Sequence, residues 1–194
     1  MEFSLKELKF GYIISHTFPG LILAIELLFL VDMSTERGIW YSILQEIKNF
    51  SNLVGIIGVF AVFATMLGLI IDAFQHLAFE SIHWIYCLAR RGKYEIYAVH
   101  EVIKKEEHLK IYNYLVVDAL WYYYEGYCNT AISLIPGIYI IPSVLQRLGI
   151  SGNWISGSRY LILFVILVLL VEGAVTYGQS RKTERKLAQT LKAG

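Results

Sequence analysis

Charge, proline and cysteine are scarce in this sequence. Of its 194 residues, 17% are charged and 56% are hydrophobic, and the mean hydropathy is +0.52. A soluble domain carries about 25% charged residues, so this composition excludes an ordinary soluble domain. The net charge is only +1, so no nucleic-acid partner is predicted.

Motifs of reactive chemistry are missing as well. The chain has no Gly-x-Ser-x-Gly, no phosphate-binding glycine loop, no Cys-x-x-Cys and no His-Glu-x-x-His. The two cysteines, Cys87 and Cys128, are interpreted as packing residues, because their expected positions do not suit a disulfide in a reducing compartment. These absences argue against an enzyme, and no cofactor is predicted.

Four apolar segments of membrane-spanning length occupy most of the chain. A helix needs roughly 20 apolar residues to cross a bilayer, which leaves no room for a second domain. We therefore expect one all-α domain over residues 1–194, an integral membrane four-helix bundle that contacts the lipid bilayer. The spans are predicted at 11–31, 53–71, 115–134 and 160–177.

Basic residues are distributed unevenly among the connections. With these spans, thirteen of the 17 Lys and Arg residues fall in the N-terminal segment, the connection at 85–111 and the tail at 179–194. The positive-inside rule therefore predicts a multi-pass protein of the cell membrane with both termini in the cytoplasm. The basic face of the tail is expected to contact anionic lipid headgroups.

Proline and glycine predict where the helices bend. Neither occurs between Leu69 and Ala89, so span two should continue into the cytoplasm, and span four should likewise continue through the tail. Pro19 lacks an amide hydrogen and should free a carbonyl about one turn earlier, near Ser15. Two prolines at 135–148 predict a bent end or a short re-entrant piece.

Every apolar segment carries at least one acidic residue. A carboxylate inside a bilayer is costly and needs a protein partner, a wet cavity or a proton. His16 is the only other ionisable residue expected well inside a span, and an unpaired set of acids favours cations. Each acid could instead be protonated or hydrogen-bonded and serve helix packing. The residues predicted to line a pathway are Glu125, Glu172, Asp72, Glu26, Asp118 and Asn129.

Helical rise assigns the acids to different depths. At about 1.5 Å per residue, Glu125 and Glu172 are expected near the middle of the bilayer. Glu26 is expected nearer the outside, and Asp72 with Asp118 nearer the cytoplasm. Together they would form a graded acidic route across the membrane.

One face of the extended second helix carries two acids and two histidines. Asp72 and His76 are four residues apart, and Glu80 and His83 are three apart, so each pair can place two ligand atoms on one metal ion. Diiron bundles need a second Glu-x-x-His, which the sequence lacks. The alternative is a solvated face whose Asp and His side chains bond each other. Candidates to complete a mononuclear site are Asp118, His100 and His108.

The cytoplasmic connection has the pattern of an amphipathic helix from Tyr94 to Ile111. Its apolar stripe must be covered. The membrane surface, the extended second helix, a second subunit or a soluble protein could each cover it. The residues predicted to dock a cytoplasmic protein partner are Tyr94, Tyr97, His100, Lys104 and Lys105.

The expected function is a cation channel or membrane-permeability effector. Four spans leave little room for a pathway within one chain, so a homo-oligomer is predicted. Small multi-span proteins of this shape occur among prokaryotic stress and defence effectors, and regulation by a cytoplasmic partner is expected. The alternatives are a membrane-embedded metal-dependent enzyme acting on a lipid, and a membrane anchor or scaffold for a soluble partner.

Overall fold

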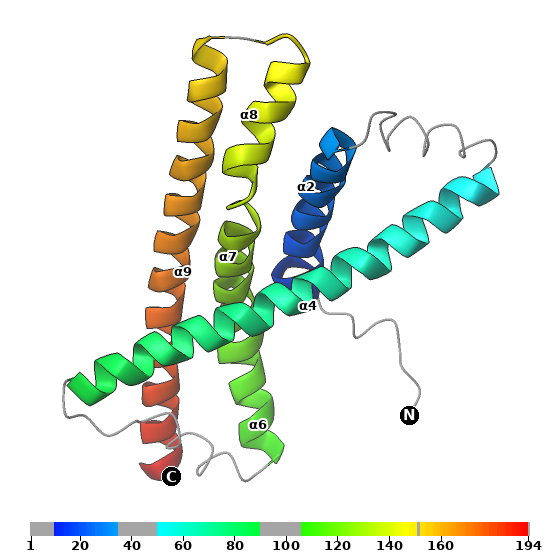
Figure 1. Ribbon diagram of the computed structural model, residues 1–194. Helices are drawn as coiled ribbons and strands as arrows, with labels where there is room; N and C mark the ends of the chain where they lie inside the picture. Colours follow the sequence, from blue (N-terminus) through cyan, green and yellow to red (C-terminus); the bar gives the residue numbers. More distant parts are fainter. Residues whose placement is uncertain (1–9, 35–49, 90–105, 151, 194) are drawn as a thin grey trace.

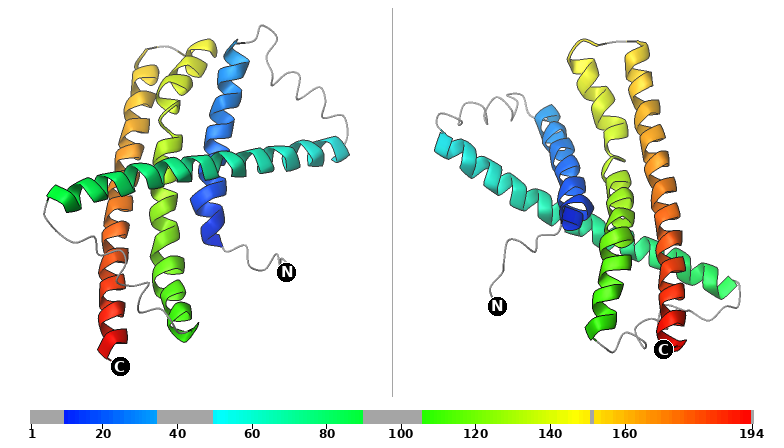
Figure 2. Two further views of the ribbon diagram at one scale, coloured as in Figure 1. Left: turned by 60° about the horizontal axis from the view of Figure 1, so that its bottom comes forward. Right: turned by 180° about the vertical axis from the view of Figure 1, so that it is seen from behind.

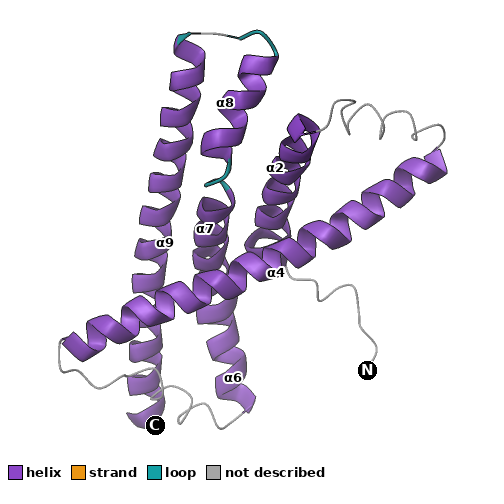
Figure 3. Cartoon of the chain, viewed as in Figure 1, coloured by secondary structure: helices purple, strands orange, loops and turns teal. Residues whose placement is uncertain are grey.

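The computed structural model describes residues 10–34, 50–89, 106–150 and 152–193, and these ranges contain helices and no strand (Figure 3). The all-helical fold is thus confirmed for the described part of the chain. The helices are α1 (Phe10–Tyr12), α2 (Phe18–Ser34), α4 (Phe50–Ala89), α6 (Glu106–Tyr112), α7 (Tyr122–Ser133), α8 (Gly137–Arg147) and α9 (Asn153–Ala193). Two π-helical segments, η2 (Ile13–Thr17) and η3 (Asn113–Trp121), join α1 to α2 and α6 to α7.

Three helices are long and apolar enough to cross a membrane. They cover Ile13–Ser34, Leu53–Ala78 and Asn153–Leu191. A fourth span results if Glu107–Ser133 and Gly137–Arg147, which meet at a bend of 49°, are counted together. Several long apolar helices indicate a membrane protein, and the bend lies in the proline-containing stretch where the sequence predicted one.

The second apolar helix is much longer than a span. α4 runs without interruption for 40 residues, about 60 Å at 1.5 Å per residue, as the sequence predicted. α9 runs for 41 residues and likewise includes the tail. Figures 1 and 2 show that α4 crosses the other helices obliquely, whereas α8 continues beyond the end of α7 and α9 runs alongside both. Helices of a regular four-helix bundle lie nearly parallel, so α4 departs from the expected arrangement.

Small residues explain the oblique crossing of α4 over the first apolar helix. Gly20 lies against the backbone of Ala64, and Gly68 lies against the backbone of His16. A methyl group at either glycine would overlap that backbone, so the two helices touch at one close point. The contact places Asp72, one turn beyond Gly68, beside His16.

A second packing region joins α7, α8 and α9. Its buried centre is formed by Ala131, Ile162 and Ile166. Gly173 of α9 faces the sulfur of Cys128, which is buried and unbonded, consistent with the packing role predicted for it. The side chain of Cys87 lies outside the described residues. This region holds α9 against the helix that carries Glu125.

The outer faces of α4 and α9 expose large apolar side chains. Val59 is 73% exposed and Leu77 is 67% exposed. Surfaces of this kind are typical of contact with lipid or with another protein chain.

Candidate functional site

A wide turn of the first apolar helix positions the first residues of the site. In η2 the amide of Phe18 donates to the carbonyl of Ile13, five residues earlier. Pro19 has no amide hydrogen to offer Ser15, and the Ser15 carbonyl instead accepts a hydrogen bond from Asn129 Nδ2 at 2.8 Å. The predicted freeing of a carbonyl near Ser15 is therefore confirmed. Single π-helical turns occur frequently at functional sites.

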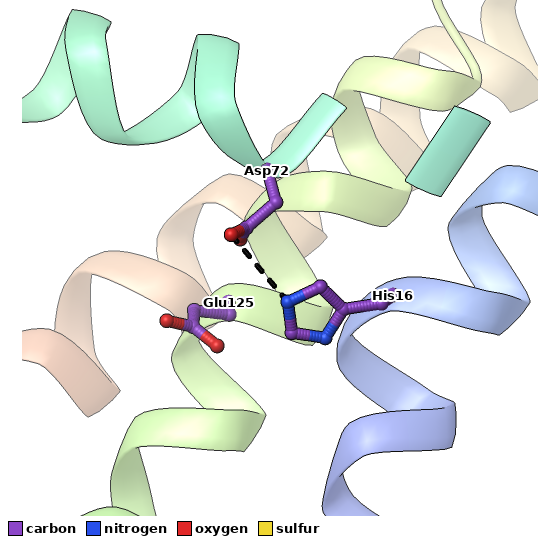
Figure 4. Close-up of side chains that lie close together, drawn as sticks. All are labelled: His16, Asp72 and Glu125. Atoms are coloured by element: carbon purple, nitrogen blue, oxygen red, sulfur yellow. Dashed lines mark ion pairs between the residues drawn. The ribbon is translucent and has the colours of Figure 1, made fainter. Parts of the chain in front are cut away.

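His16 is buried at the centre of this wide turn. Its Nδ1 lies 2.5 Å from Ser15 Oγ, and its Nε2 lies 3.4 Å from Asp72 Oδ2 of α4. The ring of Tyr12 stacks on the imidazole with 4.5 Å between centroids. His16 is thus held on both ring nitrogens and on one face, with Nε2 directed at the carboxylate (Figure 4).

Asp72 has polar partners at both carboxyl oxygens. Asn129 Nδ2 donates to Oδ1 at 2.9 Å and so bridges Asp72 to the Ser15 carbonyl. Oδ2 lies 3.4 Å from His16 Nε2 and 3.6 Å from His76 Nε2. Asp72 therefore joins the first apolar helix, its own helix and α7.

Glu125 extends the array on the α7 side. Its Oε1 lies 3.2 Å from His76 Nε2 and accepts a hydrogen bond from Trp121 Nε1. The rings of His76 and Trp121 are stacked with 6.2 Å between centroids. We refer to His16, Asp72, His76 and Glu125 as the imidazole–carboxylate cluster.

The members of the cluster differ in their exposure. His16 and Glu125 are 7% and 4% exposed, whereas the side chain of His76 is 34% exposed. Next to it, the buried Gln75 donates a hydrogen bond to the buried Tyr124. The accessible member is thus His76, which lies between the carboxylates of Asp72 and Glu125, whereas His16 and Glu125 at the two ends of the series are buried.

Three of the predicted pathway residues meet in or beside this cluster: Asp72, Glu125 and Asn129. Two others lie elsewhere. Glu26 is buried against Gly137 at the amino end of α8, where the helix dipole favours a negative charge. Glu172 is exposed on the outer face of α9.

His108, a candidate to complete a mononuclear metal site, lies on α6, whereas the other remaining predicted site residues fall outside the part of the chain whose side chains are described. They are Asp118, Glu80 and His83 within helices, and Tyr94, Tyr97, His100, Lys104 and Lys105 of the cytoplasmic connection. Of the four residues proposed for a metal on the second helix, the structure describes the side chains of Asp72 and His76.

Two expectations about the acids differ from the structure. Asp72 and Glu125 are not an unpaired set, because His16 and His76 lie within 3.6 Å of their oxygens. Nor do they lie at separate levels, since His76 contacts both. The depth count assumed that every helix runs along the membrane normal, and the oblique course of α4 removes that assumption. Sequence reasoning missed the role of His16 in this site, although its position within one helical turn of Pro19 was a usable signal.

Comparisons with known proteins give no relative for this chain. No protein-family model matches it, and neither the curated proteins nor the solved structures provide a match. Function must therefore be argued from the chemistry of the site.

The hydrogen bond between Asn129 and the Ser15 carbonyl yields a testable coupling. Asn129→Leu should lower the free energy of unfolding by about 2 kcal/mol, because two buried acceptors lose their donor. Pro19→Ala supplies an amide hydrogen within reach of that carbonyl, so the double variant should regain about 1 kcal/mol.

The coupling between the two substitutions is measured by denaturant unfolding in detergent of the wild type, the two single variants and the double variant. Asn153→Leu, which removes an exposed amide at the start of α9, is the control and should change stability by less than about 0.5 kcal/mol. Strictly additive effects of Pro19→Ala and Asn129→Leu would contradict the assigned role of the freed carbonyl.

Proposed function

We propose that this chain is a four-span membrane protein with cytoplasmic termini that assembles into a cation pathway, and that the imidazole–carboxylate cluster transfers protons in it. One observation carries the proposal. His16, Asp72, His76 and Glu125 form a continuous series in which neighbouring polar atoms are 3.2–3.6 Å apart, inside apolar helices.

The order of groups in the cluster suits proton transfer. A neutral imidazole nitrogen accepts a proton and an imidazolium releases it again, so His76 Nε2, which lies beside both Asp72 Oδ2 and Glu125 Oε1, can take a proton from one carboxyl group and pass it to the other. Asp72 stands between the two imidazoles, and Glu125 follows His76. Because each separation is close to a hydrogen-bond length, small side-chain rotations are enough to connect successive groups.

The exposed position of Glu172 is an argument for the assembly of several copies of the chain. This residue is exposed on α9 between the half-exposed apolar residues Val171 and Val175. A carboxylate facing hydrocarbon is costly, and a neighbouring copy that covers this face removes the cost. We therefore expect flux to rise more steeply than in proportion to the protein-to-lipid ratio.

Regulation by a cytoplasmic protein, lipid headgroup contact at the tail and a role in stress or defence remain predictions from the sequence. The lipid-directed metal enzyme is a second candidate, since histidine and carboxylate groups gather at one place in the described residues. A measurement of proton flux distinguishes the two candidates, because only the cation pathway is expected to conduct protons.

The proposal is tested in liposomes that contain a pH-sensitive dye. Vesicles with the full chain should dissipate a pH gradient faster than empty vesicles, and Glu125→Gln should reduce the rate about tenfold by ending the series at His76. Glu107→Gln, at an exposed acid of α6, is the matched control and should conduct normally. Equal rates for protein-containing and empty vesicles, or a normal rate for Glu125→Gln, would overturn the proposal.

A further inference from the structure

The four polar atoms at the centre of the cluster have the spacing of metal ligands. His16 Nε2 and Asp72 Oδ2 are 3.4 Å apart, His76 Nε2 and Asp72 Oδ2 are 3.6 Å apart, and His76 Nε2 and Glu125 Oε1 are 3.2 Å apart. Bonds of about 2.0–2.1 Å in a tetrahedron place neighbouring ligand atoms about 3.3 Å from each other. Three of the six edges of such a tetrahedron are therefore already present.

Three of the four residues also bring their ligand atoms close to one another. Ligand atoms of His16, Asp72 and Glu125 all lie within 4.8 Å of one another. His76 lies outside this three-residue set, and its partly exposed side chain would have to turn toward His16 to complete the tetrahedron. We propose that His16, Asp72, His76 and Glu125 bind one divalent transition-metal ion of the Zn²⁺ type.

Groups around the ligands hold them in the orientation that a metal requires. Ser15 Oγ lies 2.5 Å from His16 Nδ1, which leaves Nε2 directed at the site. Asn129 Nδ2 occupies Asp72 Oδ1 at 2.9 Å and leaves Oδ2 facing both imidazoles. Trp121 donates to Glu125. Such outer contacts fix ligand orientation in known metal sites, and their loss typically lowers affinity about 10–100-fold.

Charge and donor type select the class of ion. Two neutral imidazoles and two carboxylates carry a charge of −2, which a divalent cation neutralises inside an apolar bundle. Imidazole favours zinc and similar transition metals, whereas Ca²⁺ and Mg²⁺ take oxygen ligands. His76, with 34% of its side chain exposed, is the most accessible of the four ligands.

A metal ion bound at this site would also regulate proton flux, and this regulatory role rests on the proposed function. A bound metal occupies the lone pairs through which the cluster accepts protons. Proton transfer and metal binding are therefore mutually exclusive, and Zn²⁺ stops the flux.

The direct test is titration of the purified full chain in detergent with ZnCl₂ in competition with a coloured chelator. Wild-type protein should bind one Zn²⁺ per chain, and bound Co²⁺ should give the visible absorption of a tetrahedral site. His16→Gln should weaken binding at least about 100-fold, and Ser15→Ala about tenfold because it only loosens the His16 ring. His108→Gln removes the α6 histidine that the sequence offered as a possible further ligand, and it should bind Zn²⁺ normally because His108 is not one of the four proposed ligands. Circular dichroism confirms that each variant is folded.

Binding and flux are then compared in the same preparation. One Zn²⁺ per chain with flux that Zn²⁺ inhibits supports both the site and the proposed function. Flux without Zn²⁺ binding, or equal weakening by His16→Gln and His108→Gln, overturns the metal site and leaves proton transfer standing. If one Zn²⁺ binds per chain but no proton flux is seen with or without Zn²⁺, the metal site is supported, proton transfer is overturned and the metal-dependent enzyme is favoured.

Discussion

Replacing Gly68 with valine should abolish proton transfer and lower the free energy of unfolding by about 3 kcal/mol. Gly68 lies against the backbone of His16, and a side chain at this position would overlap it. α4 would have to move away from the first apolar helix, which would carry Asp72 away from His16 Nε2, now 3.4 Å from its Oδ2. One added side chain outside the cluster would thus separate two of its members.

The matched control for this change lies on the same helix. Gly58→Val adds the same atoms where nothing lies within 4 Å, so it removes the same backbone freedom without creating an overlap. It should retain normal flux and near-normal stability. Both variants are compared by dye-detected flux in liposomes and by denaturant unfolding in detergent. A Gly68→Val protein with normal flux would show that the close crossing does not assemble the site.

Features that depend on neighbours in the sequence could be predicted. Hydropathy located the apolar helices, and the absence of helix-breaking residues predicted that α4 continues to Ala89. The missing amide of Pro19 predicted an available carbonyl near Ser15, because the effect of proline acts within one helical turn. Even the bend after Ser133 followed from local proline chemistry.

The cluster itself depended on contacts between distant segments. Nothing near Asp72 in the sequence indicates that Gly68 will meet His16, more than 50 positions earlier in the chain. The angle of that crossing decides which carboxylates share a histidine, and periodicity along one helix cannot supply it. The spacing of Asp72 and His76 correctly placed them on one face, but their other partners, His16 and Glu125, come from two different helices.

Asp72 should prove the most sensitive residue of the cluster. Because its Oδ2 lies between both imidazoles, Asp72→Asn should reduce proton flux at least about 100-fold, more than the loss expected for Glu125→Gln at the end of the series. The amide can still accept a hydrogen bond from Asn129 through its oxygen and donate to His16 through its nitrogen. Most of the stability should therefore remain in this variant.

Asp72→Leu should separate folding from transfer. Leucine offers no polar atom to His16, His76 or Asn129, and breaking a buried ion pair from one side typically costs about 3–5 kcal/mol. This variant should lose both flux and stability, whereas Asp72→Asn should lose flux alone. The comparison uses the same liposome assay and unfolding measurements, with Glu107→Gln as the exposed-acid control. Normal flux in Asp72→Asn would mean that the carboxylate serves packing, since an amide keeps its hydrogen bonds but cannot take up and release the proton.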